Sequence, residues 1–272
     1  MGIKVITDSI CDVPKNYADR YGIRVMPLTV HFGNISYVDG IDLTLEEFLE
    51  KLEKAEALPT TSQVTPGDFF EAYKEEIAAG NKVISIHASS HLSGTYNSAV
   101  IAKEQMAGAD IHVIDTMGIS LGAGLLAIKA VRLAEEGMEA EDIVKQIEVS
   151  KQKMKYILVL DTLKYLQKGG RISLSAAMLG SILSIKPILT VVNGKLELFE
   201  KASRCRARAH SLMDNYLPPS AEVNPDVMSD SDIGKLGDDV INYPVFDALF
   251  RVMDAINMEL NIIMDELHRL DS

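Results

Sequence analysis

The chain has 272 residues, enough for one large or two medium domains, and its 47% hydrophobic and 24% charged residues exclude an intrinsically disordered protein. Its formal net charge of −12 would repel a phosphate backbone, so we expect no nucleic-acid partner. The two cysteines, Cys11 and Cys205, belong to no CxxC pair, which excludes a disulfide scaffold and a zinc ribbon.

Residues 1–150 alternate short β-branched runs with longer helical patterns, which predicts an N-terminal α/β domain with a mostly parallel sheet and crossover helices. Asp12 is the predicted N-cap of the first helix, which Gly22 ends. The expected strands are 3–7, 23–32, 82–87 and 111–115. The expected helices are 12–22, 44–57, 65–80, 94–106, 119–136 and 141–154.

The pattern changes near residue 150, where we expect a second, smaller α/β domain that extends to residue 217. It should contain a strand at 156–160, a short helix at 163–167 and an apolar helix at 173–185. Asn193-Gly194 lies between two extended runs, and both residues tolerate the positive φ of a type I′ turn. This pair predicts an antiparallel hairpin.

The last part of the chain differs from the rest. Residues 218–239 are rich in Pro, Ser, Asn, Asp and Gly, so we expect a linker there. Residues 240–272 predict one amphipathic helix, because apolar residues recur every three or four positions from Val245 to Leu270. The apolar face needs a partner, and we favour self-association over docking on the second domain.

Two clusters of hydroxyl side chains precede predicted helices. One is Ser89-Ser90-His91-Leu92-Ser93-Gly94-Thr95, which follows a strand, and the other is Thr60-Thr61-Ser62-Gln63. In an open α/β sheet, ligands bind beyond the carboxyl ends of the strands, where helix N-termini favour anions. These clusters therefore suit an anionic head group, although Ser and Thr at such positions also simply cap helices.

Four motifs in fixed order carry a resemblance to a known family. They are Ile6-Thr7-Asp8-Ser9, Thr61-Ser62-Gln63, Ser89 to Tyr96, and Asp161 to Ser173. Over about residues 1–208 the chain resembles the DegV family. The resemblance implies a two-domain α/β fold that holds a long-chain fatty acid between its domains. It also implies a bacterial protein that presents the fatty-acid carboxylate to a separate ATP-dependent fatty-acid kinase subunit and needs no cofactor.

The resemblance also implies roles for individual residues. Thr61 and Ser93 match the family residues that hydrogen-bond the carboxylate, and Ser62 and Gly94 match residues that shape that site. Arg171 matches a family arginine near the head group. Its planar guanidinium would suit a carboxylate. The alternative for Arg171 is a surface ion pair.

The acyl chain would need an apolar slot, for which residues 121–128 and 176–185 are candidates if they are not ordinary core. The resemblance ends near Arg208. The family's second domain ends with a histidine beside a Gly-Pro-Gly turn, and that histidine also contacts the carboxylate. This sequence has no such motif, because His268 lies between Leu267 and Arg269.

A serine hydrolase is the alternative function. Residues 118–122 match the G-x-S-x-G nucleophile elbow around Ser120, with His210 and His268 downstream. Against it, Thr116 and Met117 separate the motif from its strand, and neither histidine lies in a strand-end loop. The simpler interpretation of the glycines is close helix packing.

The remaining polar residues predict no metal site. Asp8 and Asp115 stand at strand ends, but no further ligand is spaced to complete a site, so we expect them to cap the following segments. Gly122-Ala123-Gly124 resembles a dinucleotide motif without its acidic ribose contact, and nothing marks His87 or His91 as a base.

Without a signal peptide or a membrane span, we expect a soluble cytoplasmic protein for which transient contact with a membrane surface stays open.

Overall fold

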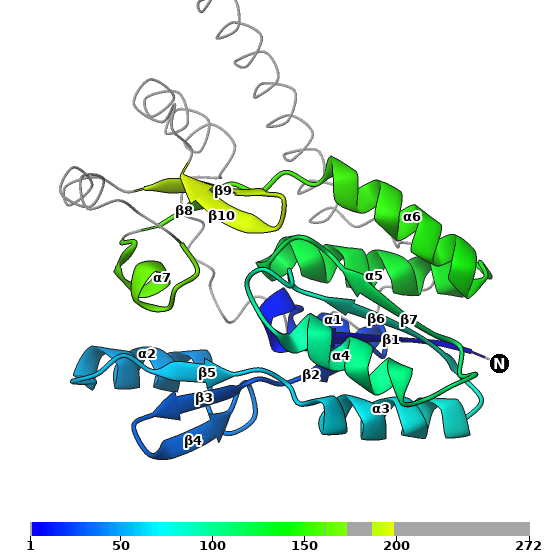
Figure 1. Ribbon diagram of the computed structural model, residues 1–272, viewed down its shortest axis with the longest axis horizontal. Coiled ribbons are helices and arrows are strands. Elements are labelled where there is room, and N and C mark those ends of the chain that lie inside the picture. The colour runs from blue at the N-terminus through cyan, green and yellow to red at the C-terminus, as the bar shows by residue number, and fades with distance from the viewer. Residues whose placement is uncertain (1, 161, 173–186, 199–272) are drawn as a thin grey trace, which may run out of the picture. The chain divides into compact units, whose positions relative to one another are not determined.

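The computed structural model of the protein describes residues 2–160, 162–172 and 187–198 (Figure 1). Its central sheet has four strands in the order β2-β1-β6-β7, and all three pairings are parallel. The sheet confirms the predicted α/β class and its parallel core. Its strands are β1 (Ile3–Asp8), β2 (Arg24–Met26), β6 (Lys82–His87) and β7 (Ile111–Asp115).

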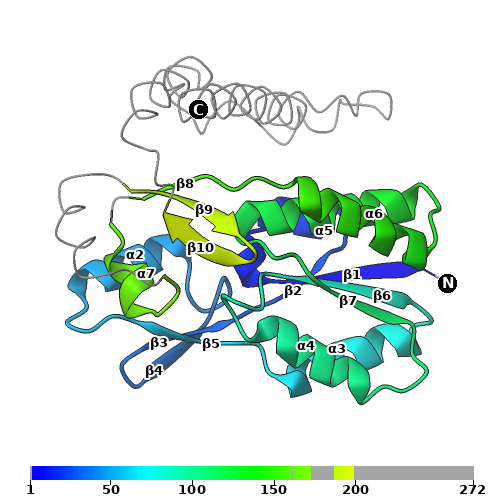
Figure 2. The same cartoon turned by 45° about the horizontal axis from the view of Figure 1, so that its top comes forward.

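Helices cover both faces of this sheet. The pair α3 (Pro66–Ala78) and α4 (Thr95–Glu104) lies on one face, and the pair α5 (Ser120–Glu135) and α6 (Ala140–Lys153) lies on the other (Figure 2). Strands covered on both sides must be buried along their length, which explains why residues 83–88 of the β6 segment are all buried.

The core between α3 and the sheet is built from large side chains. Phe69 and Tyr73 of α3 pack against Ile6 of β1 and Val83 of β6, and all four are fully buried. The helix begins where the sequence predicts, because Thr65 and Asp68 form a reciprocal capping box and Pro66 occupies the first turn.

A second, small sheet departs from the predicted elements. Residues 23–32 are not one strand, because Pro27 has no N–H to continue a ladder and β2 ends at Met26. After it, β3 (Thr29–Phe32) pairs antiparallel with β4 (Ile35–Val38) and β5 (Thr60–Ser62). The sequence does not predict β4, and for residues 60–62 it predicts only a polar segment before a helix. Beside this sheet, α2 (Leu45–Lys54) begins at the capping box of Thr44 and Glu47.

The predicted cap of the first helix is wrong. Pro14, not Asp12, is the N-cap of α1 (Lys15–Arg20). Asp12 instead ends the 3-10 helix η1 (Ser9–Cys11) in the left-handed region, with φ of 48°. An aspartate tolerates this conformation better than most residues, and its side chain is then free to bond elsewhere. The chain turns at Gly22, as predicted, with φ of 59°.

The third sheet contains the predicted hairpin. Strands β9 (Ile188–Val192) and β10 (Lys195–Leu198) pair antiparallel across Asn193 and Gly194, whose φ values are 49° and 77°. The strand β8 (Leu158–Val159) pairs with β9, and α7 (Lys164–Lys168) follows β8 in the chain. None of the helices in the described ranges has the length and apolarity of a membrane-spanning segment.

Three expectations lie outside the described residues: the apolar helix at 173–185, the linker at 218–239 and the amphipathic helix at 240–272 with its self-association. The domain boundary at residue 150 stays a prediction.

Candidate functional site

The strand order of the central sheet marks a ligand-binding position. The chain leaves β1 for β2 on one side and returns to β6 and then β7 on the other side. The connections therefore reverse between β1 and β6, and loops that diverge at such a point leave room for a ligand. The loops concerned are residues 9–12 after β1 and residues 88–94 after β6. We call them the β1 loop and the β6 loop.

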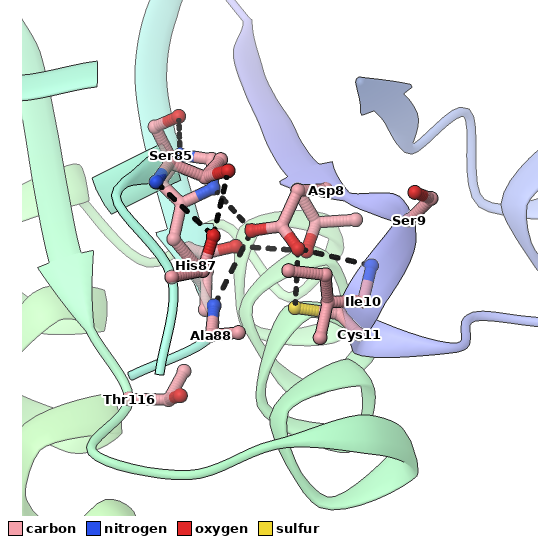
Figure 3. A network of polar contacts seen from close by, with 12 residues as sticks. Asp8, Ser9, Ile10, Cys11, Ser85, His87, Ala88 and Thr116 are labelled. Atoms are coloured by element: carbon pink, nitrogen blue, oxygen red, sulfur yellow. Dashed lines mark hydrogen bonds and ion pairs between the residues drawn. The ribbon is translucent and has the colours of Figure 1, made fainter. Parts of the chain in front are cut away.

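The buried carboxylate of Asp8 connects these two loops (Figure 3). Its Oδ1 accepts a hydrogen bond from the backbone N–H of Ile10 at 3.0 Å, in the β1 loop. Its Oδ2 accepts from Nδ1 of His87 at 2.8 Å and from the backbone N–H of Ala88 at 3.3 Å, in the β6 loop. Asp8 therefore caps the segment that follows its strand, as predicted, and also reaches the neighbouring loop.

The network continues below His87 into the core. Nε2 of His87 lies 2.7 Å from Oγ of Ser85, and the hydroxyl of Tyr73 donates to the same Oγ at 2.8 Å. Since Ser85 accepts from Tyr73, its own proton points to Nε2, which leaves the Nδ1 proton to donate to Asp8. Burial raises the pKa of Tyr73 well above its ordinary value, so its hydroxyl stays a donor.

The two hydroxyl clusters of the sequence lie on adjoining segments. Thr61 and Ser62 are in β5, and Nε2 of Gln63, the next residue, donates to Oγ of Ser98 in α4 at 2.8 Å. Any side chain at Gly94 would collide with Oε1 of Gln63. The absence of a side chain at Gly94 thus leaves room for the Gln63 side chain beside the beginning of α4.

The candidate hydroxyls have different partners. Oγ of Ser93 donates to Oγ1 of Thr95 at 3.0 Å and accepts from its backbone N–H at 3.2 Å, so it bonds the first residue of α4, whose N-cap is Gly94. Oγ of Ser62 lies 2.7 Å from Nε2 of His31. Thr61 is exposed and lines a cavity. Ser93 therefore supports the beginning of α4 without being its N-cap, unlike the simpler interpretation of this cluster as helix caps.

That cavity has a volume of about 700 Å³ and extends from the β1 loop to α1, β3 and α2. Its wall is mostly apolar, with Val25, Val30 and Phe48 among the lining residues. None of residues 121–128, the expected slot, lines this cavity, and Leu125 to Ile128 are buried in the core on the face of α5. The other expected part, residues 176–185, lies outside the described residues.

The β6 loop is held from two further directions. Nε of Arg171 donates to the carbonyl of Leu92 at 3.1 Å, and its guanidinium also bonds the carbonyl of Gly169. Oγ of Ser89 donates to the carbonyl of Gly194 at 2.7 Å, at the tip of the β9–β10 hairpin. In the described part of the chain, Arg171 thus supports the loop that carries Ser93 rather than forming the surface ion pair considered as its alternative.

The G-x-S-x-G motif has a packing explanation. Side chains at Gly118 and Gly122 would collide with the ring of Tyr156, so both glycines make room for that ring. Oγ of Ser120 donates to Oδ2 of Asp12 at 2.6 Å. No described histidine bonds Ser120, and the two histidines considered as partners lie outside the described residues. The structure gives the hydrolase interpretation no support.

Asp12, the partner of Ser120, has a raised pKa that affects the stability of the fold. Although solvent reaches one side of Asp12, the surrounding loops desolvate its carboxylate and raise its pKa, and repulsion from Asp39 and Asp8 adds to the rise. The Ser120 hydroxyl opposes it. A raised pKa favours the protonated folded state, so this contribution to stability is lost as the pH rises through the interval between the ordinary and the raised pKa.

We therefore expect Asp12→Asn to be more stable than the wild type at pH 7, because asparagine carries no charge and suits positive φ. Below the ordinary carboxyl pKa of about 4 the advantage should shrink, since Asp12 is then protonated. Urea unfolding of both chains at the two pH values measures it. An advantage that grows toward acid would contradict the sign of the shift.

Within the described ranges, no group of three or more His, Cys, Asp or Glu side chains is placed to hold a metal ion. Asp115 accepts from the backbone N–H of Met117 and of Ser90, as expected of a residue that caps its loop.

Comparison with known proteins identifies the family. A family model described as "Uncharacterised protein, DegV family" matches residues 2–222. The chain belongs to the DegV family. A DegV domain-containing protein of Clostridium perfringens is 39% identical over 214 residues, which are 79% of this chain and 77% of the relative. One from Caldanaerobacter subterraneus is 40% identical over 199 residues, 73% of this chain and 71% of the relative.

Solved DegV structures share the fold. The structure described as fatty acid binding of a DegV family protein from Thermus thermophilus is 35% identical and has a TM-score of 0.69 over 78% of this chain and 77% of that one. DegV of Bacillus subtilis, described as a fatty acid binding protein, is also 35% identical, with a TM-score of 0.68 over 79% and 78% of the two chains. DegV proteins of the same fold therefore bind fatty acids.

Proposed function

We propose that this DegV protein binds a long-chain fatty acid whose carboxylate lies at Thr61 and Ser93, with Ser62 and Gly94 shaping the site. The observation that carries the proposal is the contact of Gln63 with Gly94 and Ser98, which joins the two hydroxyl-bearing segments at the carboxyl end of the sheet. The fatty-acid binding of the Thermus thermophilus and Bacillus subtilis proteins supports it.

The chemistry of the site suits a carboxylate. Hydroxyl groups donate hydrogen bonds without neutralising the ligand charge. Ser93 also lies directly before Gly94, the N-cap of α4, so it is next to the positive end of the helix dipole. Arg171, which bonds the carbonyl of Leu92 next to Ser93, adds a positive charge near this end. The affinity itself would come from the acyl chain, at about 0.8 kcal/mol for each buried methylene.

The carrier would act with a partner. We propose that the bound carboxylate is presented to a separate fatty-acid kinase subunit, where a carboxylate oxygen attacks the γ-phosphorus of ATP and ADP leaves, which forms an acyl phosphate. A carboxylate held by neutral donors keeps its nucleophilic oxygen lone pairs, as this step requires. Dependence on ATP places the complex in the bacterial cytoplasm. On this proposal the chain performs no covalent step itself, and it needs neither a cofactor nor nucleic acid.

The proposal predicts that fatty acid accompanies the purified full-length chain. Mass spectrometry of an organic extract should find about one long-chain fatty acid per chain, since burial of some fifteen methylenes gives slow dissociation. Delipidated protein should take up added palmitate or oleate. A chain that yields no fatty acid and takes up neither ligand is not a carrier. Incubation of loaded chain with a kinase subunit, ATP and hydroxylamine should trap a fatty hydroxamate, whose absence would remove the kinase step alone.

A further inference from the structure

We propose that the buried pair Asp8 and His87 sets the affinity of the head-group site by holding the β1 loop and the β6 loop in register. His87 is a positioning residue that acts through Asp8 and touches no ligand. The inference rests on the proposed fatty-acid function for its effect on affinity. Its structural part concerns the two loops alone.

The first support is that the two oxygens of the Asp8 carboxylate bond different loops. Oδ1 of Asp8 serves the β1 loop, through the N–H of Ile10, and Oδ2 serves the β6 loop, through the N–H of Ala88 (Figure 3). The two side chains of the pair are fully buried and 79 residues apart in sequence. A rotation of the carboxylate would therefore shift both loops together.

The second support is that the carboxylate cannot hold its orientation alone. A buried carboxylate needs hydrogen-bond partners for its oxygens, and its side-chain donors among the described contacts are Nδ1 of His87 at 2.8 Å and the weakly donating Sγ of Cys11 at 3.8 Å. The imidazole is held in turn by Ser85 at Nε2 and by the ring of Phe69, whose centroid lies 4.9 Å away in an edge contact. His87 therefore fixes the direction of Asp8.

The third support is the stiffness of the path from Ala88 to Ser93. The backbone N–H groups of Leu92 and Ser93 both donate to the carbonyl of Ser89, at 2.9 and 3.0 Å, so the β6 loop is a closed turn. Ser89 is itself bonded to Gly118 and Gly194. A shift at Ala88 consequently reaches the hydroxyl of Ser93 rather than dissipating along a loose chain.

The order Asp8–His87–Ser85 resembles a catalytic triad, but it does not act as one. Ser85 is fully buried, accepts from Tyr73 and donates to His87, so neither a substrate nor a water molecule reaches its oxygen. The network faces the loops at its Asp8 end only. Its function is to position backbone groups.

Two isosteric variants separate positioning from packing. The amide nitrogen of His87→Asn takes the place of Nδ1 and can still donate to Asp8, whereas the amide of His87→Gln reaches the place of Nε2, toward Ser85. We expect His87→Gln to raise the oleate Kd about tenfold, because the charged partner loses a bond, and His87→Asn to raise it less than about threefold. Titration calorimetry of the full chain measures both. Ile84→Val, on the opposite face of β6, is the matched control and should leave Kd unchanged.

A spectroscopic measurement follows the loops directly. In ¹⁵N-labelled full-length chain, the amide resonances of Ile10 and Ala88 should move together in His87→Gln and stay near their wild-type positions in His87→Asn. If both variants weaken binding equally and the two amides do not move together, His87 has only a structural role and the inference is wrong.

The remaining outcomes are also decisive. If the wild type binds neither palmitate nor oleate, the proposed function fails, while the amide resonances still test the positioning. If a His87 variant does not fold, Tyr73→Phe replaces it, since it removes only the hydroxyl that orients Ser85. That variant should raise Kd about twofold to threefold and move the same two amides to a smaller extent. Unchanged Kd and unchanged amides would overturn the inference.

Discussion

The double variant Thr61→Ala/Ser93→Ala is expected to lose fatty-acid binding by about two orders of magnitude in Kd. Each hydroxyl should contribute about 1–3 kcal/mol, the scale for removing one hydrogen bond from a charged group. Each single variant should accordingly weaken oleate binding about tenfold. Titration calorimetry with delipidated protein gives all three constants, and the fraction folded is checked by circular dichroism because Ser93 also bonds the first residue of α4.

Two further substitutions control this experiment. Ser120→Ala removes a hydroxyl that bonds Asp12 instead of the head-group segments, so Kd should change less than about twofold. Ser93→Asp keeps an acceptor for the first turn of α4 but brings a negative charge to the ligand carboxylate, so binding should fall at least as far as in Ser93→Ala. If Ser120→Ala weakens binding more than Ser93→Ala, the carboxylate lies elsewhere and the assignment of the site is wrong.

The largest loss of stability is expected for Gly124→Ala. A methyl group at Gly124, on the buried face of α5, would overlap the backbone oxygen of Cys11 and press on Val13. A backbone atom cannot move aside as a flexible side chain can, so the η1 turn must shift. We expect the free energy of unfolding to fall by about 1–3 kcal/mol. Urea unfolding followed by circular dichroism measures the change.

Gly67→Ala is the matched control, because Gly67 is also a helical glycine with ordinary φ. A methyl group there would meet only Oγ1 of Thr65 at 3.7 Å, a normal contact distance. Alanine is a better helix former than glycine, so this variant should be as stable as the wild type or slightly more stable. Equal losses in the two variants would mean that the contact of α5 with the η1 turn is not what constrains Gly124.

The central sheet was predictable because its strands are buried on both faces. Runs such as Val83 to Ile86 are typical of strands covered on both faces, and the intervening helices carry their own caps, as at Thr65. The small β3–β4–β5 sheet was not predicted, since Thr60–Ser62 is short, exposed and polar. Pairing with β3 makes it a strand. Gly33-Asn34, between β3 and β4, was the available hairpin signal.

The site was predictable only in part, for a similar reason. Polar residues after a strand indicate an anion site by themselves, so the hydroxyl clusters could be found locally. The pairing of Asp8 with His87 could not, because it depends on the register of β1 and β6, which sets Thr7 opposite Ile86. The local indication was weaker. Ser85 and His87 are polar residues on one face of a strand that is otherwise apolar, and such residues need buried partners.

The bond between Ser89 and Gly194 joins residues 105 positions apart, and this separation bears on the order of events during translation. All four strands of the central sheet have been synthesised once Asp115 is added to the growing chain. The β9–β10 hairpin, however, is still many residues from emerging. Because a growing chain folds from its N-terminus as its partners appear, the sheet can assemble while the β6 loop still lacks the hairpin that anchors it. Nascent chains that stop short of Gly194 would therefore carry a complete sheet and an unfinished loop.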